Sequence, residues 1–238
     1  MQNNVVKKTL VFVVIALFIG IAVQPGISTN TMPKEEKTDV EPKDYLFQTI
    51  LDIANNPEVK DLFEKAKNNG NFISYDYDTR SVLLKVSHKK PWLFASLLFT
   101  RPTISYRYLD LAYRQGSKIL DIIGEEEALR IINSTNITDP LILNSFSSTI
   151  YNNEELPGRI TKLIEMSAGE NICIMLMLLF LATIPLAALA EGITYFPNNP
   201  VLGIILTIIG VPFIYLALIF LILFVALGCD FYVGPGLS

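Results

Sequence analysis

Two uncharged stretches decide how this chain is organised: ICIMLMLLFLATIPLAALA at Ile172–Ala190 and VLGIILTIIGVPFIYLALIFLILFVALGC at Val201–Cys229. They contain 19 and 29 residues, and only the ten residues Glu191–Pro200 separate them. A helix needs roughly 20 apolar residues to cross the hydrocarbon core of a bilayer. The two stretches therefore predict a transmembrane helical hairpin at 171–230, followed by a short extracytoplasmic tail at 231–238.

A third apolar stretch, Leu10–Val23, follows a pair of lysines near the N-terminus. Its 14 residues are typical of a secretory signal, and Gly26 and Ser28 provide small residues for cleavage after Ser28. Residues 1–28 are therefore predicted to be a signal peptide, with an uncleaved signal anchor as the alternative. Both place the following domain outside the cytoplasm. The run from Lys7 to Ser28 resembles secretory leaders of archaeal membrane proteins, and this resemblance implies no activity.

The region between the leader and the hairpin divides into a linker and a domain. Residues 29–42 are polar and contain prolines, which predicts a flexible linker. Residues 43–170 carry apolar side chains at helical spacing and helix-start signals such as Asn56-Pro57. Alternating apolar residues predict one β-hairpin over Asn71–Ser87. The predicted fold class is mainly α: a helical extracytoplasmic domain followed by a two-helix transmembrane hairpin.

Charge is distributed unevenly along that domain. Thr29–Thr79 has 6 basic and 11 acidic residues, Arg80–Lys118 has 8 and 1, and Ile119–Glu170 has 3 and 9. Aromatic residues lie among the cations of the basic segment, a combination that suits anionic lipid at a membrane interface or another polyanion. The candidate contact residues are Lys89, Lys90, Trp92, Phe94 and Arg101. The alternative is that Trp92–Phe99 forms a core helix and that the cations pair with the flanking acidic regions.

The two cysteines of the chain, Cys173 and Cys229, lie at opposite ends of the predicted hairpin. An up-and-down pair of helices brings these ends to the same membrane face. A disulfide is predicted there if the Cα atoms come within about 7 Å of each other. The alternative is two small apolar residues at the bilayer boundary.

Small and polar residues elsewhere supply further candidates. Asn133 and Asn136 begin two adjacent glycosylation sequons in a predicted exported loop. Within the hairpin, pairs of small residues favour close helix packing. These pairs are Thr183 with Ala187 and Gly203 with Thr207.

No residue pattern in the chain points to catalysis, a cofactor or a metal ion. His88 is the single histidine, and Glu125–Glu127 opens a helix, where acids offset the positive end of the helix dipole. Neither predicted span contains Asp, Glu, Lys, Arg or His, which argues against a self-sufficient ion-coupled transporter.

The leading functional hypothesis is a membrane-tethered extracytoplasmic binding or structural module without catalytic activity. Its expected partners are membrane lipid and another membrane or surface protein, and not nucleic acid. The first alternative is an accessory subunit of a membrane transporter or membrane enzyme complex. The second is an extracytoplasmic hydrolase. All three place the chain in the cell membrane as a multi-pass protein.

Overall fold

The computed structural model describes residues 41–68, 73–75, 79–99, 104–137, 140–167, 172–187, 189 and 200–229. They belong to one compact unit, Val40–Ser238. The helices in chain order are α2 (Pro42–Asn55), α3 (Pro57–Asn68), α4 (Thr79–Lys89), α5 (Trp92–Phe99), α6 (Tyr106–Ile123), α7 (Glu125–Ser134), α8 (Pro140–Asn152), α9 (Leu156–Ser167), α10 (Ile172–Ala187) and α12 (Pro200–Ala226). Two short strands, β1 (Ile73–Tyr75) and β2 (Thr135–Ile137), pair antiparallel. The fold is mainly helical, as predicted.

Side-chain caps explain where several helices begin. Asn56 accepts hydrogen bonds through Oδ1 from two backbone amides in the first turn of α3, at 2.8 and 3.2 Å. Asn153 accepts in the same way from two amides at the start of α9, at 3.0 and 3.1 Å. Ser105 caps α6 by accepting from the amide of Tyr108. These contacts satisfy amides that have no partner within the helix.

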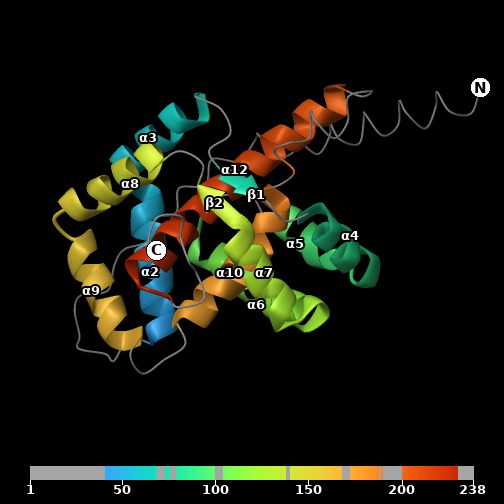
Figure 1. Cartoon of the computed structure of the whole chain (residues 1–238), viewed down its shortest axis with the longest axis horizontal. Coiled ribbons are helices and arrows are strands. Elements are labelled where there is room, and N and C mark those ends of the chain that lie inside the picture. The colour runs from blue at the N-terminus through green and yellow to red at the C-terminus, as the bar shows by residue number, and fades with distance from the viewer. Residues whose placement is uncertain are drawn as a thin grey trace, which may run out of the picture. The chain divides into compact units, whose positions relative to one another are not determined.

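The apolar helix α10 lies at the centre of the unit. It packs against α6 on one side and α12 on another, and it also contacts α2, α4, α7 and α9. Thirteen of its 16 residues are buried. Figure 1 shows α2, α3, α8 and α9 on one side of the α10–α12 pair and α4 and α5 on the other. A helix that is apolar around its whole circumference needs such a complete enclosure in the absence of lipid.

Polar contacts fasten the outer helices to one another. Arg159 of α9 forms an ion pair with Asp52 of α2 at 2.8 Å. Lys43 of α2 forms another with Asp110 of α6 at 3.0 Å. α2 thus joins the α8–α9 side of the unit to α6.

The predicted β-hairpin over Asn71–Ser87 is wrong. Thr79–Lys89 is the helix α4, and the partner of β1 is β2, about sixty residues later in the chain. Val82 and Val86, which alternate with Leu84 in sequence, are also one helical turn apart, and both are buried. A short alternating run is compatible with a helix as well as a strand, and here packing of the valines into the core decides for the helix.

The predicted boundary between a domain at 43–170 and a hairpin at 171–230 does not divide the structure into two compact units. α10 and α12 share one hydrophobic core with α2, α6 and the other helices. The apolar stretches therefore supply the centre of the domain. The leader at 1–28, most of the linker at 29–42 and the tail at 231–238 lie outside the described residues.

Candidate membrane-contacting surface

One face of α4 combines cations with an exposed apolar side chain. Leu84, Lys85, His88 and Lys89 follow the spacing of a single helix face, and all four are exposed. Leu84 is 60% exposed. Val82 and Val86 of the same helix enter the core and thereby fix the rotation of α4 about its axis.

The turn after α4 continues this exposed surface. Lys90 and Trp92 are both exposed, and Trp92 retains 77% of its accessible area. We call Leu84, Lys85, Lys89, Lys90 and Trp92 the α4–α5 patch. In the part of the chain that the structure describes, Lys85, Lys89 and Lys90 form no ion pair. The α4–α5 patch is therefore positive and partly apolar.

The structure divides the candidates for lipid or polyanion contact. Lys89, Lys90 and Trp92 lie together in the α4–α5 patch. Phe94 was expected on the same surface, but it is buried in the core together with Leu93 and Leu97 of α5. Arg101 lies outside the described residues. Trp92–Phe99 is thus a core helix, as the second alternative predicted, although its first residue is exposed. Contact of this segment with lipid or a polyanion stays a prediction.

The single acid of the basic segment cannot neutralise the α4–α5 patch, because it is already paired. Asp110 accepts a hydrogen bond from Lys43 at 3.0 Å and also pairs with Arg114. The hydrogen bond from Lys43 is the main reason that the pKa of Asp110 is lowered, and the charges of Lys43 and Arg114 add to it. Asp110 therefore stays ionised and bound to α2 and α6.

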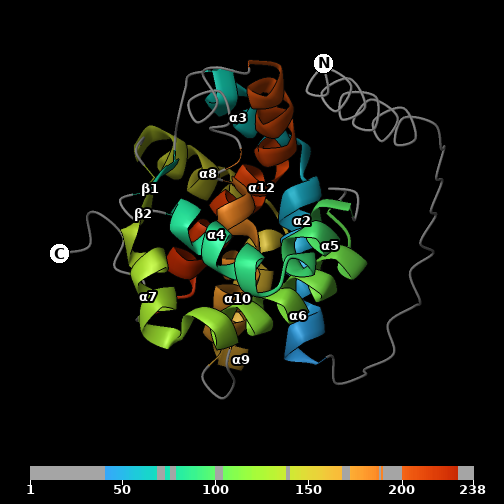
Figure 2. The same ribbon diagram turned by 90° about the vertical axis from the view of Figure 1, so that its right-hand side faces the viewer.

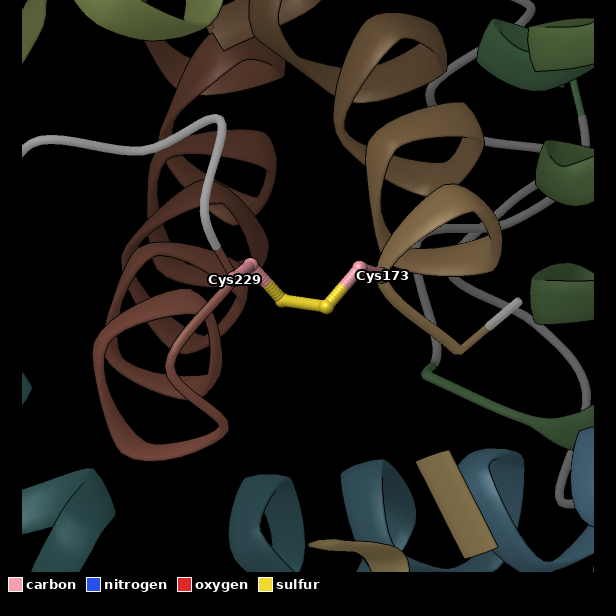
Figure 3. Close-up of a disulfide and its surroundings, with 2 residues drawn as sticks. All are labelled: Cys173 and Cys229. Atoms are coloured by element: carbon pink, nitrogen blue, oxygen red, sulfur yellow. A yellow bond between two sulfur atoms is a disulfide. The ribbon is translucent and has the colours of Figure 1, made fainter. Parts of the chain in front are cut away.

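The two cysteines are joined by a disulfide. Figure 3 shows it connecting Cys173 at the start of α10 to Cys229 just after the end of α12. The Cα atoms are 5.7 Å apart, inside the limit that a disulfide requires. Because α10 and α12 run in opposite directions, the bond closes the open end of the pair and makes a covalent loop with a sequence separation of 56 residues.

α12 changes its surroundings along its length. From Phe213 to Phe224 nearly every side chain is buried. Before Pro212, three aliphatic side chains spaced along one face are exposed, namely Val201 (58%), Ile204 (49%) and Ile208 (57%). One helix in the described part of the chain, Gly203–Ala226, is long and apolar enough to cross a membrane. Most of its exposed apolar side chains lie in the first half, and Val225 near the other end is also exposed (37%).

The predicted helix-packing residues fall on both sides of this division. Thr183 and Ala187 are buried in α10, and the Thr183 hydroxyl donates to the carbonyl groups of its own helix, at 3.1 Å. Gly203 is buried in the first turn of α12, and Thr207 donates to the Gly203 carbonyl at 3.0 Å. Both hydroxyls are satisfied within their own helices, so neither is needed for a contact between helices.

The predicted glycosylation sequons are not in a loop. Asn133 is exposed but lies in the last turn of α7. Asn136 belongs to β2, and its side chain is outside the described part. Thr135, the third residue of the first sequon, is fully buried and donates to the Ile131 carbonyl at 2.8 Å. The helical register and the strand pairing leave only Asn133 as a side chain that the structure shows to be accessible.

The described residues offer two shallow pockets. One, of about 130 Å³, is lined mainly by apolar residues of α8, α9 and the end of α12. The other, of about 230 Å³, is lined by Asp52, Asn55, Asn56, Asn153 and Glu155 with Leu156. Three of its polar side chains already have structural partners: Asp52 pairs with Arg159, and Asn56 and Asn153 cap helices. Among the described residues no group of three or more His, Cys, Asp or Glu side chains is arranged to hold a metal ion.

Sequence reasoning missed the residue at the closest approach of α6 and α10. A Cβ atom built on Gly116 would lie 1.9 Å from the backbone oxygen of Leu178. Gly116 on an otherwise apolar face of a helix is a signal for such contact. Sequence reasoning also missed the buried hydrogen bond that Tyr215 donates to the Ala54 carbonyl at 3.0 Å. A tyrosine in an apolar run does not reveal which group accepts its hydrogen bond.

The chain matches no protein-family model, none of the curated proteins compared with it and no solved structure.

Proposed function

We propose that this chain is an extracytoplasmic helical module that contacts the membrane through the α4–α5 patch and that acts by binding rather than by catalysis. The main support is the patch itself. The α4–α5 patch contains Lys85, Lys89 and Lys90, which form no ion pair among the described residues, together with the exposed apolar side chains of Leu84 and Trp92 (77% exposed). Tryptophan is favoured at the headgroup level of a bilayer, and lysines beside it attract anionic lipid.

The disulfide supports an extracytoplasmic location. Disulfides persist in oxidising compartments and are rare in the cytosol. Cys173 and Cys229 are the only cysteines of the chain, and both are in the bond. The signal-like stretch Leu10–Val23 points to the same compartment.

The multi-pass arrangement predicted from the two apolar stretches requires both α10 and α12 to cross the bilayer. α10 has 16 residues and rises about 24 Å, against roughly 30 Å for the hydrocarbon core. To cross a bilayer as a hairpin with α12, it would also have to leave its contacts with the other five surrounding helices. We therefore propose attachment of the folded unit to the membrane surface, with a spanning hairpin as the rival arrangement.

Trp92 provides a direct test because it is the only tryptophan in the chain. The full chain is reconstituted into vesicles that contain phospholipids with brominated acyl chains, and Trp92 fluorescence is recorded. We expect a blue shift and quenching in vesicles rich in anionic lipid, and weaker effects in zwitterionic vesicles. The Lys89→Glu/Lys90→Glu variant should lose most of the quenching.

Lys60→Glu/Lys65→Glu is the matched control. These two exposed lysines lie on α3, and their replacement changes the net charge by the same amount. We expect this control to retain the quenching. An unshifted, unquenched Trp92 in both kinds of vesicle would contradict the proposal.

A further inference from the structure

The α10–α12 pair is apolar at its exposed positions as well as at its buried ones. The uncharged stretches 172–190 and 201–229 contain no Asp, Glu, Lys, Arg or His. A helix that serves only as a core element of a water-soluble unit is expected to be polar where it faces water. In the described parts of α10 and α12 five residues are exposed, and all of them are aliphatic: Ile174, Val201, Ile204, Ile208 and Val225.

α6 has the usual pattern and provides a comparison within the same unit. It buries an apolar face and packs against α10. Its exposed residues all carry a polar group: Tyr106, Arg107, Arg114, Ser117, Lys118 and Asp121. Burial in this unit does not require an aliphatic side chain at an exposed position. The composition of α10 and α12 therefore indicates a second environment, and a helix that is apolar around its whole circumference suits hydrocarbon.

The lengths and the ends of the pair fit a complete crossing of the bilayer. α12 has 27 residues and rises about 40 Å, more than the roughly 30 Å of the hydrocarbon core. Its first turn and the preceding Asn198-Asn199 would therefore lie in water on the far side. The uncharged stretch 172–190 would rise about 28 Å as a helix. The disulfide in Figure 3 joins the two ends that would stay on the near side, so no helix end is left in hydrocarbon.

The contact between α6 and the pair contains a buried polar group that lacks a partner. Tyr108 of α6 is 1% exposed, and its ring lies 6.4 Å from the Phe213 ring of α12. Among the described residues no group forms a hydrogen bond with the Tyr108 hydroxyl. Such a group destabilises the packing around it. Departure of α12 would open this face of α6 to water, which would supply the missing hydrogen bond.

The outer helices have polar connections that do not involve α10 or α12. Arg159 of α9 pairs with Asp52 of α2, and Lys43 of α2 pairs with Asp110 of α6. Figures 1 and 2 show the helices α2, α4, α6, α7 and α9, which contact α10, arranged around it. Amphipathic helices of this kind lie stably in the headgroup region of a bilayer. The outer helices can thus stay connected at the membrane surface when the pair leaves them.

We propose that the unit described here is one of two states, and that the α10–α12 pair leaves α6 and crosses the bilayer as a disulfide-linked hairpin while the outer helices remain at the surface. This inference rests on the proposed membrane contact, which brings the closed unit to the bilayer. The spanning hairpin is then a second state of the chain that follows surface attachment.

Labelling from inside vesicles tests the crossing, because the unreduced protein has no free thiol. Single cysteines are introduced by Val201→Cys, in the first turn of α12, and by Leu141→Cys, at a residue of α8 that is 73% exposed. Each full-length protein is added to preformed anionic vesicles that enclose a membrane-impermeant thiol reagent. We expect the enclosed reagent to label residue 201 and not residue 141. Peptide mapping under non-reducing conditions verifies that the native disulfide is retained.

Substitutions on α6 test whether release from this helix is required. Gly116→Ala places a Cβ against the Leu178 backbone, so in the Val201→Cys protein it should speed labelling from inside by about tenfold or more. Tyr108→Phe removes the hydroxyl that has no partner, stabilises the closed unit and should slow labelling by about fivefold. Gly158→Ala, at a position with open space, should leave the rate unchanged. Tyr108→Phe keeps the test decisive if the Gly116→Ala protein does not fold.

The possible results separate this inference from the proposed membrane contact. If residue 201 is never labelled from inside, in vesicles where Trp92 is quenched, the crossing is refuted and the membrane contact stands. If Trp92 is also unquenched, both fail. Equal labelling of residues 201 and 141 from inside would overturn the crossing of the hairpin alone. Labelling rates that neither Tyr108→Phe nor Gly116→Ala changes would refute the release from α6.

Discussion

Gly116 shows how much one missing side chain determines in this unit. A Cβ at this position would meet the backbone of Leu178, so α6 and α10 can keep this close contact only with glycine here. We expect Gly116→Ala to lower the free energy of unfolding by about 3 kcal/mol, because the new Cβ meets a carbonyl oxygen that cannot rotate away. Urea unfolding followed by circular dichroism measures the loss.

Gly158→Ala is the control for this substitution. Gly158 lies in α9 with open space around its Cβ position, so alanine should leave stability unchanged or raise it by up to about 1 kcal/mol through helix propensity. A Gly116→Ala protein that is as stable as the parent would mean that α6 and α10 are farther apart than described.

Asp110 gives a stability contribution that depends on pH. Because Lys43 and Arg114 lower the pKa of Asp110 in the folded state, the stabilisation is fully present above the unfolded value of 3.8. It is lost as the pH falls below 3.8 and through the folded pKa. We expect Asp110→Asn to lower the free energy of unfolding by about 1 kcal/mol at neutral pH. The substitution should have no effect once the carboxyl of the parent is protonated.

Urea unfolding of the parent and Asp110→Asn at a series of pH values measures this difference. Asp121→Asn, an exposed acid on the same helix, should have little effect at any pH. A difference between Asp110→Asn and the parent that persists unchanged into strong acid would refute the assignment of the effect to ionised Asp110.

At the scale of elements, the disulfide should be the strongest single constraint on α10 and α12. Closing a loop of this size, with a sequence separation of 56, limits the unfolded chain and contributes about 2–4 kcal/mol. We expect Cys173→Ser/Cys229→Ser to lower the unfolding free energy by this amount. Thermal unfolding of the parent with and without reductant should give the same difference.

The double-serine variant supplies the control, since reductant should not affect its melting temperature. If reductant also leaves the melting temperature of the parent unchanged, the two cysteines are not bonded. They are then the pair of small apolar residues that the sequence also allowed.

The helices that the sequence predicted correctly are those with local signals. Asn56-Pro57 marks the start of α3, and Glu125–Glu127 opens α7. The error at Asn71–Ser87 arose where the deciding contact is remote, since β1 pairs with residues 135–137 and α4 is fixed by packing on α6 and α10. Local spacing contains no information about either contact.

The α4–α5 patch could likewise be predicted only in part from the sequence. Lys89, Lys90 and Trp92 could be selected from their side-chain chemistry alone. Whether Trp92 or Phe94 points outward depends on the orientation of α5 against α6, which only the packed structure gives. The exposed aliphatic row on the first half of α12 was also hidden in sequence, because exposed and buried residues of α12 are equally apolar.

At the scale of the whole molecule, the main difference from expectation is the role of the apolar stretches. α10 forms part of the core on which α6 and the outer helices pack. We therefore expect residues 40–170 not to fold without the segment that follows. A fragment of residues 40–170 should lack a cooperative thermal transition and should be digested rapidly by protease.

The comparison chain for this experiment contains residues 40–238, which include the complete unit. This longer chain should unfold cooperatively under the same conditions. Cooperative unfolding of the 40–170 fragment would instead restore the separate domain that the sequence predicted.

The bond between Cys173 and Cys229 also sets an order of events during synthesis. Cys229 follows every helix described here, so the ribosome must add 56 residues after Cys173 before the bond can form. At 5–20 residues per second this takes about 3–11 s. During that interval α10 has been made but its neighbour α12 has not, and its apolar surface needs shelter from other chains. A free thiol at Cys173 in newly made protein therefore identifies a chain whose central helices have not yet come together.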